Sequence, residues 1–387
     1  MTMVNFCVKI CILSGNIGET MRICQFTEAT TAGVFTHITQ LSEHMKINHV
    51  EQTFLLSSLQ NPDLNRRDEF HGNRLLIFDI KRSRNPVYFL NRLVKLIKIL
   101  REERFNILHC HSSFAGIYGR LAGCFVPEMK IVYTPHSFSF NQKTSKIIRT
   151  LLEFLERTLS LITDSIVCVS ESEYKRACDI GISQQKLTVI KNGISKVTAN
   201  LNKQNWLVKH GYDHNTRIVG FIGRLSRQKR PDVFIQALRD SKLSHVCFVI
   251  VGNGPEYEMV RSMTQDYPFT LVTEAKGAEI VQIFDVYVNT SDWEAMPYTI
   301  LEAMIHGIPV IATKIPDVME LIKDNNTGFL VNSGDTKQLA DKIDEILYNK
   351  EKLDVIGENG RKMVESQHSI EQMIARTLDL YNRLVIK

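Results

Sequence analysis

The sequence has no apolar run long enough to cross a membrane. A spanning helix needs about 20 predominantly apolar residues, and no stretch of this 387-residue chain approaches that length. The opening segment MTMVNFCVKICILSGNIGET is moderately apolar, but Lys9 interrupts it and no small-residue cleavage site is clear. We therefore expect no signal peptide. We interpret residues 1–20 as an extension upstream of a start at MRICQFTEA, or as a short surface-lying segment.

The sequence also lacks cysteine pairs with the spacing of a disulfide framework or a zinc site. Its eight cysteines are scattered, mostly within apolar runs such as IVCVS and VCFVIV, without a CxxC pair or a histidine-rich ligand motif. Buried thiols in a reducing compartment account for this pattern better than disulfides or zinc. The sequence therefore predicts a cytoplasmic protein.

A strong charge of one sign is missing as well. The formal net charge of +5 is mild for this length, so nucleic acid is not expected as a partner. No GxGxxG run opens a helix, which disfavours a nicotinamide dehydrogenase.

What the sequence does contain is a regular alternation of strand-like runs and amphipathic helix patterns. Strand-like runs in the first half are RICQFTEA, QTFLLSS, RLLIFDI, NILHCHS, KIVYTPHS and SIVCVSES. Those in the second half are RIVGFIGRL, HVCFVIVGNG, FTLVTE, VYVNTS, PVIAT and GFLVN. This alternation predicts a doubly wound α/β architecture with two sheets, and a site between two domains is then the default expectation.

A polar stretch rich in Asn and Lys, from Asn192 to Asn215, is the best candidate for a linker between the sheets. The predicted organisation is as follows: extension 1–20, amino-terminal domain 21–195, linker 196–215, carboxyl-terminal domain 216–365 and a last helix 366–387.

Two glutamates stand eight residues apart in SDWEAMPYTILEAMIHGIPVIAT. The preceding run VYVNTS is typical of a buried strand, Pro297 suits a helix start and Gly307 a helix end. Glu294 then lies at the carboxyl end of a parallel strand, where ligands bind and where helix amides suit an anion. Carboxylates at such a place are explained if they accept hydrogen bonds from hydroxyls of the same ligand. A nucleotide-sugar, which is part phosphate and part polyol, satisfies both conditions.

A basic loop lies in the same half of the chain. In FIGRLSRQKRPDVFIQAL a strand runs into a loop that carries Arg224 and Lys229, and Pro231 then starts a helix. Two cations at this place could neutralise a departing diphosphate; the alternative is a solvated basic loop. In VGNGPEYEMV, Gly252 and Gly254 could allow close approach to a ligand, or could simply form a tight turn.

The amino-terminal half offers a glycine and three histidines. Gly33 in TTAGVFTHI precedes the first helix and could bring its amides to a phosphate, although an ordinary turn explains it about equally well. His136 in YTPHSFSF and both His109 and His111 in ILHCHSS end strands, where they could bond sugar hydroxyls or an acceptor. A lone histidine more often satisfies a buried backbone group, so we place His136 first, His111 second and His109 last.

The stretch from Lys81 to Arg104 predicts a basic amphipathic helix. Such a helix can lie on an anionic membrane surface. The alternative, which we favour slightly, is a helix packed on the sheet with its charges in water.

Together these motifs resemble the retaining nucleotide-sugar glycosyltransferases of GT-B fold, known as glycosyltransferase family 4 or glycosyl transferases group 1, of the bacterial polysaccharide-biosynthesis type. GRLSRQK, GNGP and the paired glutamates carry the resemblance, which covers the chain from Met21 to its end. TTAGVFTHI resembles the glycine loop of the family, and ILHCHSSFAGIYGRLAG and IVYTPHSFSF resemble its acceptor-domain signatures. The resemblance implies a GT-B fold, in which two Rossmann-like domains face a central cleft, with the last helix packing back toward the first domain.

The resemblance also implies a role for each matching residue. Arg224 and Lys229 would hold the donor diphosphate, Glu294 would bond the transferred sugar, and Glu302 would bond the ribose. His136 would lie near the reacting centre and His111 on the acceptor side. The implied catalytic residues are His136, Glu294, Arg224 and Lys229. The implied donor-binding residues are Gly33, Arg224, Lys229, Gly252, Gly254, Glu294, Met296, Pro297, Tyr298, Thr299 and Glu302.

The sequence departs from the family pattern at a few positions. Ala295 stands where Gly or Ser is usual, Ala32 where a second glycine is common, and Ile305 where Ala is frequent. None of these departures removes a charged group.

We therefore expect a retaining hexosyltransferase that moves a hexose or N-acetylhexosamine from a UDP- or GDP-sugar to a hydroxyl. The expected acceptor is a lipid-linked sugar at the cytoplasmic membrane face, in capsule, O-antigen or exopolysaccharide biosynthesis, which implies peripheral attachment. No D-x-D triplet occurs, so we expect neither a metal nor another cofactor. The alternatives are a nucleotide-sugar epimerase of similar fold and a non-catalytic sugar-nucleotide-binding subunit.

Overall fold

The computed structural model describes residues 20–45, 50–61, 70–81, 83–197, 201–241, 243, 245–265 and 267–385. Apart from Thr20, the extension predicted over residues 1–20 lies outside this part of the chain.

The first half of the chain forms a parallel sheet of seven strands in the order β3-β2-β1-β4-β5-β6-β7. Its strands are β1 (Met21–Thr27), β2 (Val50–Leu56), β3 (Arg74–Ile77), β4 (Ile107–His111), β5 (Lys130–Thr134), β6 (Ser165–Cys168) and β7 (Leu187–Val189). The sequence predicted the first six strands. It missed β7 because Thr188 interrupts its short apolar run, and polar residues precede it.

The second half forms a parallel sheet of six strands in the order β10-β9-β8-β11-β12-β13. Its strands are β8 (Arg217–Ile222), β9 (Val246–Val251), β10 (Phe269–Val272), β11 (Val286–Asn289), β12 (Val310–Thr313) and β13 (Phe329–Val331). All six had been predicted from apolar runs, which are typical of strands buried on both faces, although the edge strand β10 is only half-buried.

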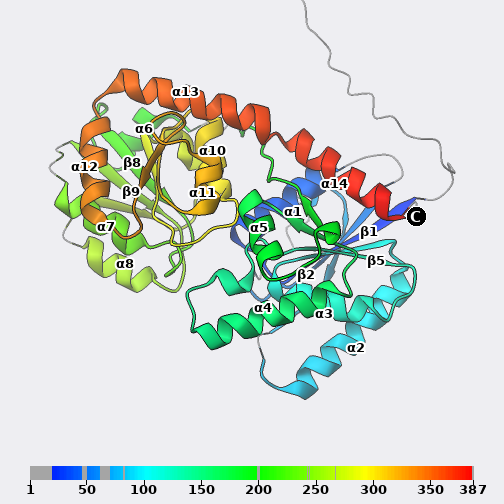
Figure 1. The fold of residues 1–387 in the computed structure, drawn as a ribbon. Coiled ribbons are helices and arrows are strands. Elements are labelled where there is room, and N and C mark those ends of the chain that lie inside the picture. Colours follow the sequence, from blue (N-terminus) through cyan, green and yellow to red (C-terminus); the bar gives the residue numbers. More distant parts are fainter. Residues whose placement is uncertain are drawn as a thin grey trace, which may run out of the picture.

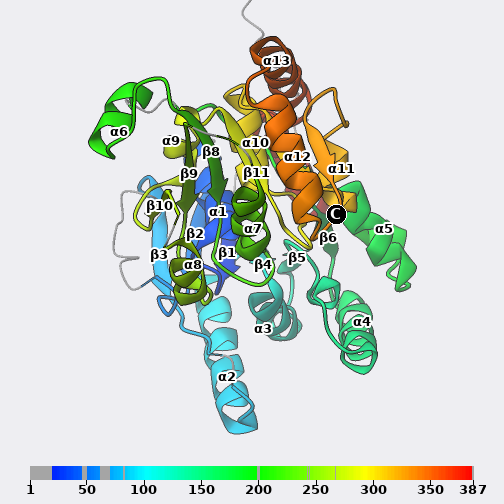
Figure 2. The ribbon, with the colours of Figure 1, turned by 90° about the vertical axis from the view of Figure 1, so that its left-hand side faces the viewer.

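Helices cover both faces of each sheet (Figures 1 and 2). Those of the first half are α1 (Ala32–His44), α2 (Pro86–Glu103), α3 (Ser113–Gly123), α4 (Lys146–Ser160) and α5 (Glu171–Asp179). Those of the second half are α6 (Lys203–Lys209), α7 (Pro231–Asp240), α8 (Tyr257–Thr264), α9 (Gly277–Ile280), α10 (Tyr298–Ile305), α11 (Pro316–Leu321), α12 (Thr336–Ile346), α13 (Lys350–Gln367) and α14 (Ile370–Val385). The two doubly wound layers confirm the predicted GT-B fold class.

Helix α14 packs on the first sheet although it follows all the other described elements in the chain (Figure 1). Its Ile370, Ile374 and Tyr381 share a buried cluster with Ile23 on β1 and Val132 on β5. The core of the amino-terminal layer is therefore closed by the carboxyl-terminal end of the chain.

Part of the stretch predicted as a linker, 196–215, is helical. It contains α6, whose Trp206 and Leu207 are buried in the core of the second half. Because polar residues surround these two side chains, the sequence did not indicate this short helix.

The cysteines in the described part of the chain are free thiols. Cys24, Cys110, Cys168 and Cys247 are buried, as the apolar runs around them indicated.

Candidate active site

Glu294 lies in the loop between β11 and α10, where it is almost fully buried. Its Oε1 accepts hydrogen bonds from Lys229 Nζ at 2.5 Å and from Ser291 Oγ at 2.6 Å. A buried carboxylate requires such partners, because an unpaired charge away from water is costly. The fold thus brings a predicted sugar-binding carboxylate and a predicted phosphate-binding cation into one ion pair.

Glu302 lies one turn into α10 and is also buried, but it differs from Glu294 in its partners. No residue in the described ranges forms a hydrogen bond or ion pair with its carboxylate. Burial alone raises the pKa of Glu302 to about 7. Near neutral pH this group exchanges a proton readily, and hydroxyl donors from a ligand would favour its ionised form.

At the amino-terminal end of α10 lies the segment from Met296 to Thr299, whose backbone was predicted to bind the donor. Pro297 occupies the N-cap position, and no side chain caps the first amides. The flanking groups are fixed, since Met296 O accepts a hydrogen bond from Asn192 Nδ2 at 2.9 Å and Thr299 Oγ1 accepts one from Tyr287 at 2.8 Å. Uncapped amides at a helix start are suited to an anion.

Arg224 follows β8 by two residues and is exposed. Within the described ranges no residue pairs with its guanidinium, which leaves the group available to a ligand at the same sheet edge.

The two glycines of the GNGP loop have a packing role. A Cβ at Gly252, where φ is +145°, would lie 2.0 Å from the carbonyl oxygen of Gly223, and a Cβ at Gly254 would lie 2.3 Å from that of Leu225. The loop after β9 therefore packs directly on the loop that carries Arg224. These contacts within the protein already account for both glycines, so a role in approaching a ligand is not needed to explain them.

Gly33 differs, because the protein itself does not require a glycine there. A Cβ at this position would meet the ring of Tyr298 at 3.6 Å, which is an ordinary contact. Its neighbour Ala32 has a φ of +58°, in the left-handed region that favours glycine. Gly33 also marks the point where α1 of the first half meets α10 of the second.

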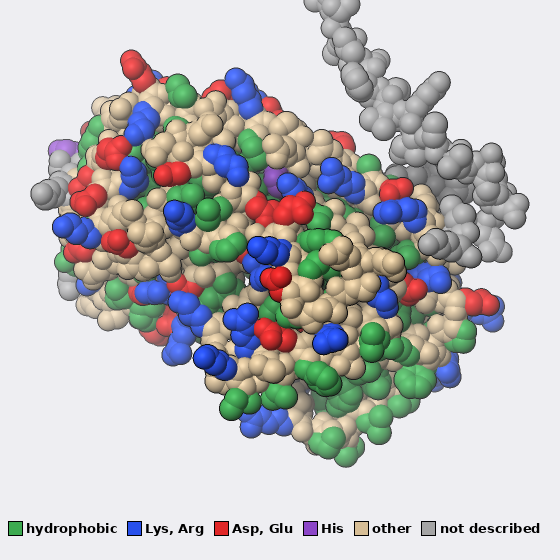
Figure 3. Space-filling view, viewed as in Figure 1, with side chains coloured by type: hydrophobic (Ala, Val, Ile, Leu, Met, Phe, Trp, Pro, Cys, Tyr) green, Lys and Arg blue, Asp and Glu red, His purple; other side chains and the backbone are tan. Residues whose placement is uncertain are grey.

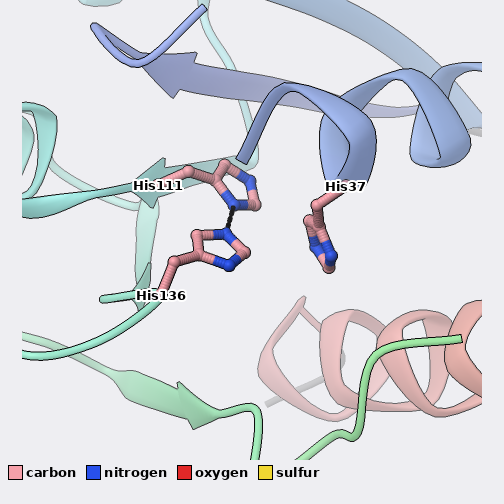
Figure 4. Close-up of side chains that lie close together, drawn as sticks. All are labelled: His37, His111 and His136. Atoms are coloured by element: carbon pink, nitrogen blue, oxygen red, sulfur yellow. Dashed lines mark hydrogen bonds between the residues drawn. The ribbon is translucent and has the colours of Figure 1, made fainter. Parts of the chain in front are cut away.

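His111 and His136 are brought together, and a histidine that the sequence analysis missed joins them (Figure 4). His111 Nδ1 lies 3.1 Å from His136 Nε2, and His37 Nδ1 on α1 lies 2.9 Å from the hydroxyl of Tyr298. Burial lowers the pKa of His37 to about 4 and lowers the pKa of His111 and of His136 well below the usual range. All three rings are therefore neutral near pH 7.

His37 could have been found from its spacing. It lies four residues after Gly33 on α1, so the two share one helix face. The histidine placed last, His109, is fully bonded beneath the site, to Tyr381 at 2.6 Å and Thr134 at 2.7 Å. This geometry is that of a buried polar residue with satisfied partners.

The two halves of the chain contact each other directly around these residues. Lys143 Nζ pairs with Asp292 at 2.8 Å, and Asp317 accepts hydrogen bonds from Arg176 at 2.6 Å and Ser170 at 3.0 Å. With the contact between His37 and Tyr298, these bonds hold the carboxyl edges of both sheets together. Sequence alone could not pair them, since they join residues more than a hundred positions apart.

Comparisons with known proteins are consistent with this geometry. Residues 202–363 match the family described as Glycosyl transferases group 1, and residues 31–196 match Glycosyltransferase Family 4. Two relatives come from Escherichia coli, each 28% identical. One is a UDP-Gal:alpha-D-GlcNAc-diphosphoundecaprenol alpha-1,3-galactosyltransferase, with 77% of this chain and 80% of the relative covered. The other is the O-antigen biosynthesis glycosyltransferase WbnH, with 90% and 97% covered.

A solved structure has the same fold. The crystal structure of Anabaena Alr3699/HepE in complex with UDP and glucose matches with a TM-score of 0.81 and 18% identity, covering 94% of this chain and all of that one. Among the helices in the described ranges, none combines the length and the apolar content that crossing a bilayer requires.

Proposed function

Because the chain belongs to the GT-B glycosyltransferases described as Glycosyl transferases group 1 and Glycosyltransferase Family 4, we propose that it is a retaining hexosyltransferase of polysaccharide biosynthesis. In this proposal it moves a hexose or N-acetylhexosamine from a UDP- or GDP-sugar to a hydroxyl of a lipid-linked sugar. The names of the relatives support the acceptor class, and the complex of HepE with UDP and glucose supports a UDP-linked donor. The observation that carries the proposal is the buried pair Lys229–Glu294 beside the uncapped start of α10.

The proposed reaction uses these groups as follows. The bond between the anomeric carbon and the donor phosphate oxygen breaks, and a short-lived ion pair with oxocarbenium character forms. The acceptor oxygen bonds to the anomeric carbon on the same face, and its proton passes to the departing phosphate oxygen. Negative charge grows on the diphosphate, where Arg224, Lys229 and the α10 amides stabilise it. Side-chain cations and helix amides supply this stabilisation, so we propose that the reaction needs no metal.

The remaining groups orient the sugar. Glu294, held by Ser291 and Lys229, accepts hydrogen bonds from sugar hydroxyls, and Glu302 accepts one from the ribose. His136 faces the transferred sugar, and Gly33 leaves space for the diphosphate on the side of α1.

A lipid-linked acceptor requires contact with a membrane. The first half exposes an apolar stripe on α4, with Ile147 75% exposed and Phe154 68% exposed, and another on α2, with Val87 73% exposed. The two helices flank α3, and hydrophobic side chains gather over this end of the molecule (Figure 3). Lys95 and Lys98 on α2 are exposed beside the stripe. We place the peripheral contact here, on α4 as well as on the helix predicted from sequence.

The test is a panel of UDP-, GDP- and ADP-sugars, scored by thermal shift and by hydrolysis, with and without EDTA. We expect one donor to stabilise the protein, EDTA to leave turnover unchanged, and Glu294→Gln to abolish turnover while remaining folded. Glu351→Gln, at an exposed position of α13, is the matched control. Wild-type turnover in Glu294→Gln would exclude the site, and conversion of a donor to its isomer without an acceptor would indicate an epimerase. Binding of a donor without turnover would favour the non-catalytic sugar-nucleotide-binding subunit.

A further inference from the structure

Three histidines from separate elements converge at the carboxyl edge of the first sheet (Figure 4). His37 lies on α1, His111 ends β4, and His136 follows β5. One ring nitrogen of each lies within 4.8 Å of the others. Tetrahedral zinc holds imidazole nitrogens at about 2.0–2.1 Å, which places them about 3.4 Å from one another. The His111–His136 pair, at 3.1 Å, already has nearly this separation. His37, whose nitrogen lies within 4.8 Å of the other two, has to move closer by up to about 1.4 Å.

His111 is oriented in the way that metal-binding imidazoles usually are. Its Nε2 lies 2.9 Å from Gln25 Oε1. The Gln25 amide is itself fixed, because its Nε2 donates to Gln52 Oε1 at 3.2 Å. Since an amide oxygen only accepts, the His111 proton resides on Nε2, and the lone pair of Nδ1 points to His136. A hydrogen bond from the distal nitrogen to an oxygen is the usual support of a ligating histidine.

From this arrangement we propose that His37, His111 and His136 form a site for one borderline transition-metal ion, such as Zn²⁺, and that its occupation inhibits the enzyme. No carboxylate in the described ranges hydrogen-bonds any of the three rings, so the site is neutral and rich in imidazole. That donor set suits Zn²⁺, Co²⁺ or Ni²⁺ and not Mg²⁺ or Ca²⁺.

Besides the movement of His37, binding requires a change of tautomer at His136. His136 Nε2 carries the proton that it donates to His111 Nδ1, so on binding this proton moves to Nδ1 of the same ring through solvent. The ion then takes the lone pair of His136 Nε2 and holds His37, which contacts Tyr298 at the start of α10. The ion would then hold His136 away from the transferred sugar and hold His37 against the start of α10, where the donor binds. Inhibition follows from these two effects. This part of the inference rests on the proposed function, whereas metal binding does not.

The first measurement is isothermal titration of the chelator-stripped full chain with ZnCl₂, together with the visible absorption of a Co²⁺ titration. We expect one ion per chain and the intense visible bands of tetrahedral Co²⁺. His37→Gln and His111→Gln should each lose the tight site, and Gln25→Met should weaken it by about 10–100-fold. His214→Gln, at an exposed position, is the control and should bind as the wild type does.

Circular dichroism verifies that each variant is folded. Absence of a stoichiometric site, or equal binding by wild type and His37→Gln, would overturn the proposal and indicate surface binding only. With a donor identified, Zn²⁺ should inhibit turnover and EDTA should restore it, while Mg²⁺ has no effect. Stoichiometric binding without inhibition would preserve the site and reject its inhibitory role, and failure to find any donor would leave the binding result standing.

Discussion

At the scale of single residues, the two predicted glutamates differ in what surrounds them. Both are buried near the start of α10, but Glu294 has a lysine and a serine as partners, whereas the carboxylate of Glu302 has none in the described ranges. The spacing of the two residues could be read from the sequence. Their surroundings could not, because the partner Lys229 lies 65 positions before Glu294 in the chain and the raised pKa of Glu302 comes from burial in the fold.

The raised pKa of Glu302, about 7, predicts a pH dependence of donor binding. If the ribose donates to the carboxylate, only the ionised form binds well, so affinity is full above pH 7 and falls below it. Donor affinity should be about tenfold weaker at pH 6 than at pH 8. Titration calorimetry at both values measures this ratio, and in Glu302→Gln the ratio should approach one. A wild-type affinity that is equal at both values would contradict the assignment.

The Glu302 carboxyl group affects folding stability with the opposite pH dependence to donor binding. Its pKa is raised from 4.5 in the unfolded chain to about 7 in the fold, so its stabilising contribution is complete below pH 4.5 and is lost as pH rises through 7. We expect Glu302→Gln to have a higher Tm than the wild type at pH 8 and a smaller difference at pH 5.5. Thermal unfolding followed by circular dichroism provides the comparison.

Ala32 offers a prediction about backbone strain. A residue other than glycine in the left-handed region costs about 1–2 kcal/mol, and glycine recovers this at some expense in unfolded-state entropy. Ala32→Gly should therefore stabilise the fold by about 1 kcal/mol in urea unfolding. Ala375→Gly, at an exposed position inside α14, should instead destabilise it by about 1 kcal/mol. A loss of stability at both positions would show that Ala32 is not strained.

At the scale of elements, the sequence predicted strands and long helices well because parallel strands buried on both faces are apolar runs. It missed β7 and α6, which are short and contain polar residues such as Thr188 and Asn205. The histidine group was predicted only in part, since His111 and His136 end strands but His37 lies on a helix and looked like one of its ordinary polar residues.

The contact between the loops after β8 and β9 makes Gly252 a sensitive position. Gly252→Ala combines a φ of +145° with a Cβ 2.0 Å from the carbonyl oxygen of Gly223, and we expect a loss of about 3 kcal/mol or more. Gly211→Ala separates the two causes, because Gly211 has a φ of +80° but no atom near its Cβ position. It should lose only about 1 kcal/mol. Equal losses in denaturant unfolding would show that the loop contact is not tight.

At the scale of the whole molecule, the apolar stripes of α2 and α4 predict where the protein meets a membrane. Replacing Leu151 and Phe154 on α4 by Ser should reduce co-sedimentation with phosphatidylglycerol vesicles by about tenfold or more, because each side chain contributes roughly 1.5–3 kcal/mol when buried. Val355→Ser, at an exposed apolar position on α13, should have no effect. Unchanged binding of the double variant would place the contact elsewhere.

The packing of α14 on the first sheet has a consequence for biosynthesis. A chain made on the ribosome usually completes its amino-terminal domain first. Here Ile370, Met373 and Tyr381 belong to the core that also holds Ile23 and Ile107, so the domain translated first is the last to be closed. Until α14 has been synthesised, that apolar surface is open to chaperones. A premature stop codon within the last helix would therefore damage the opposite end of the gene product.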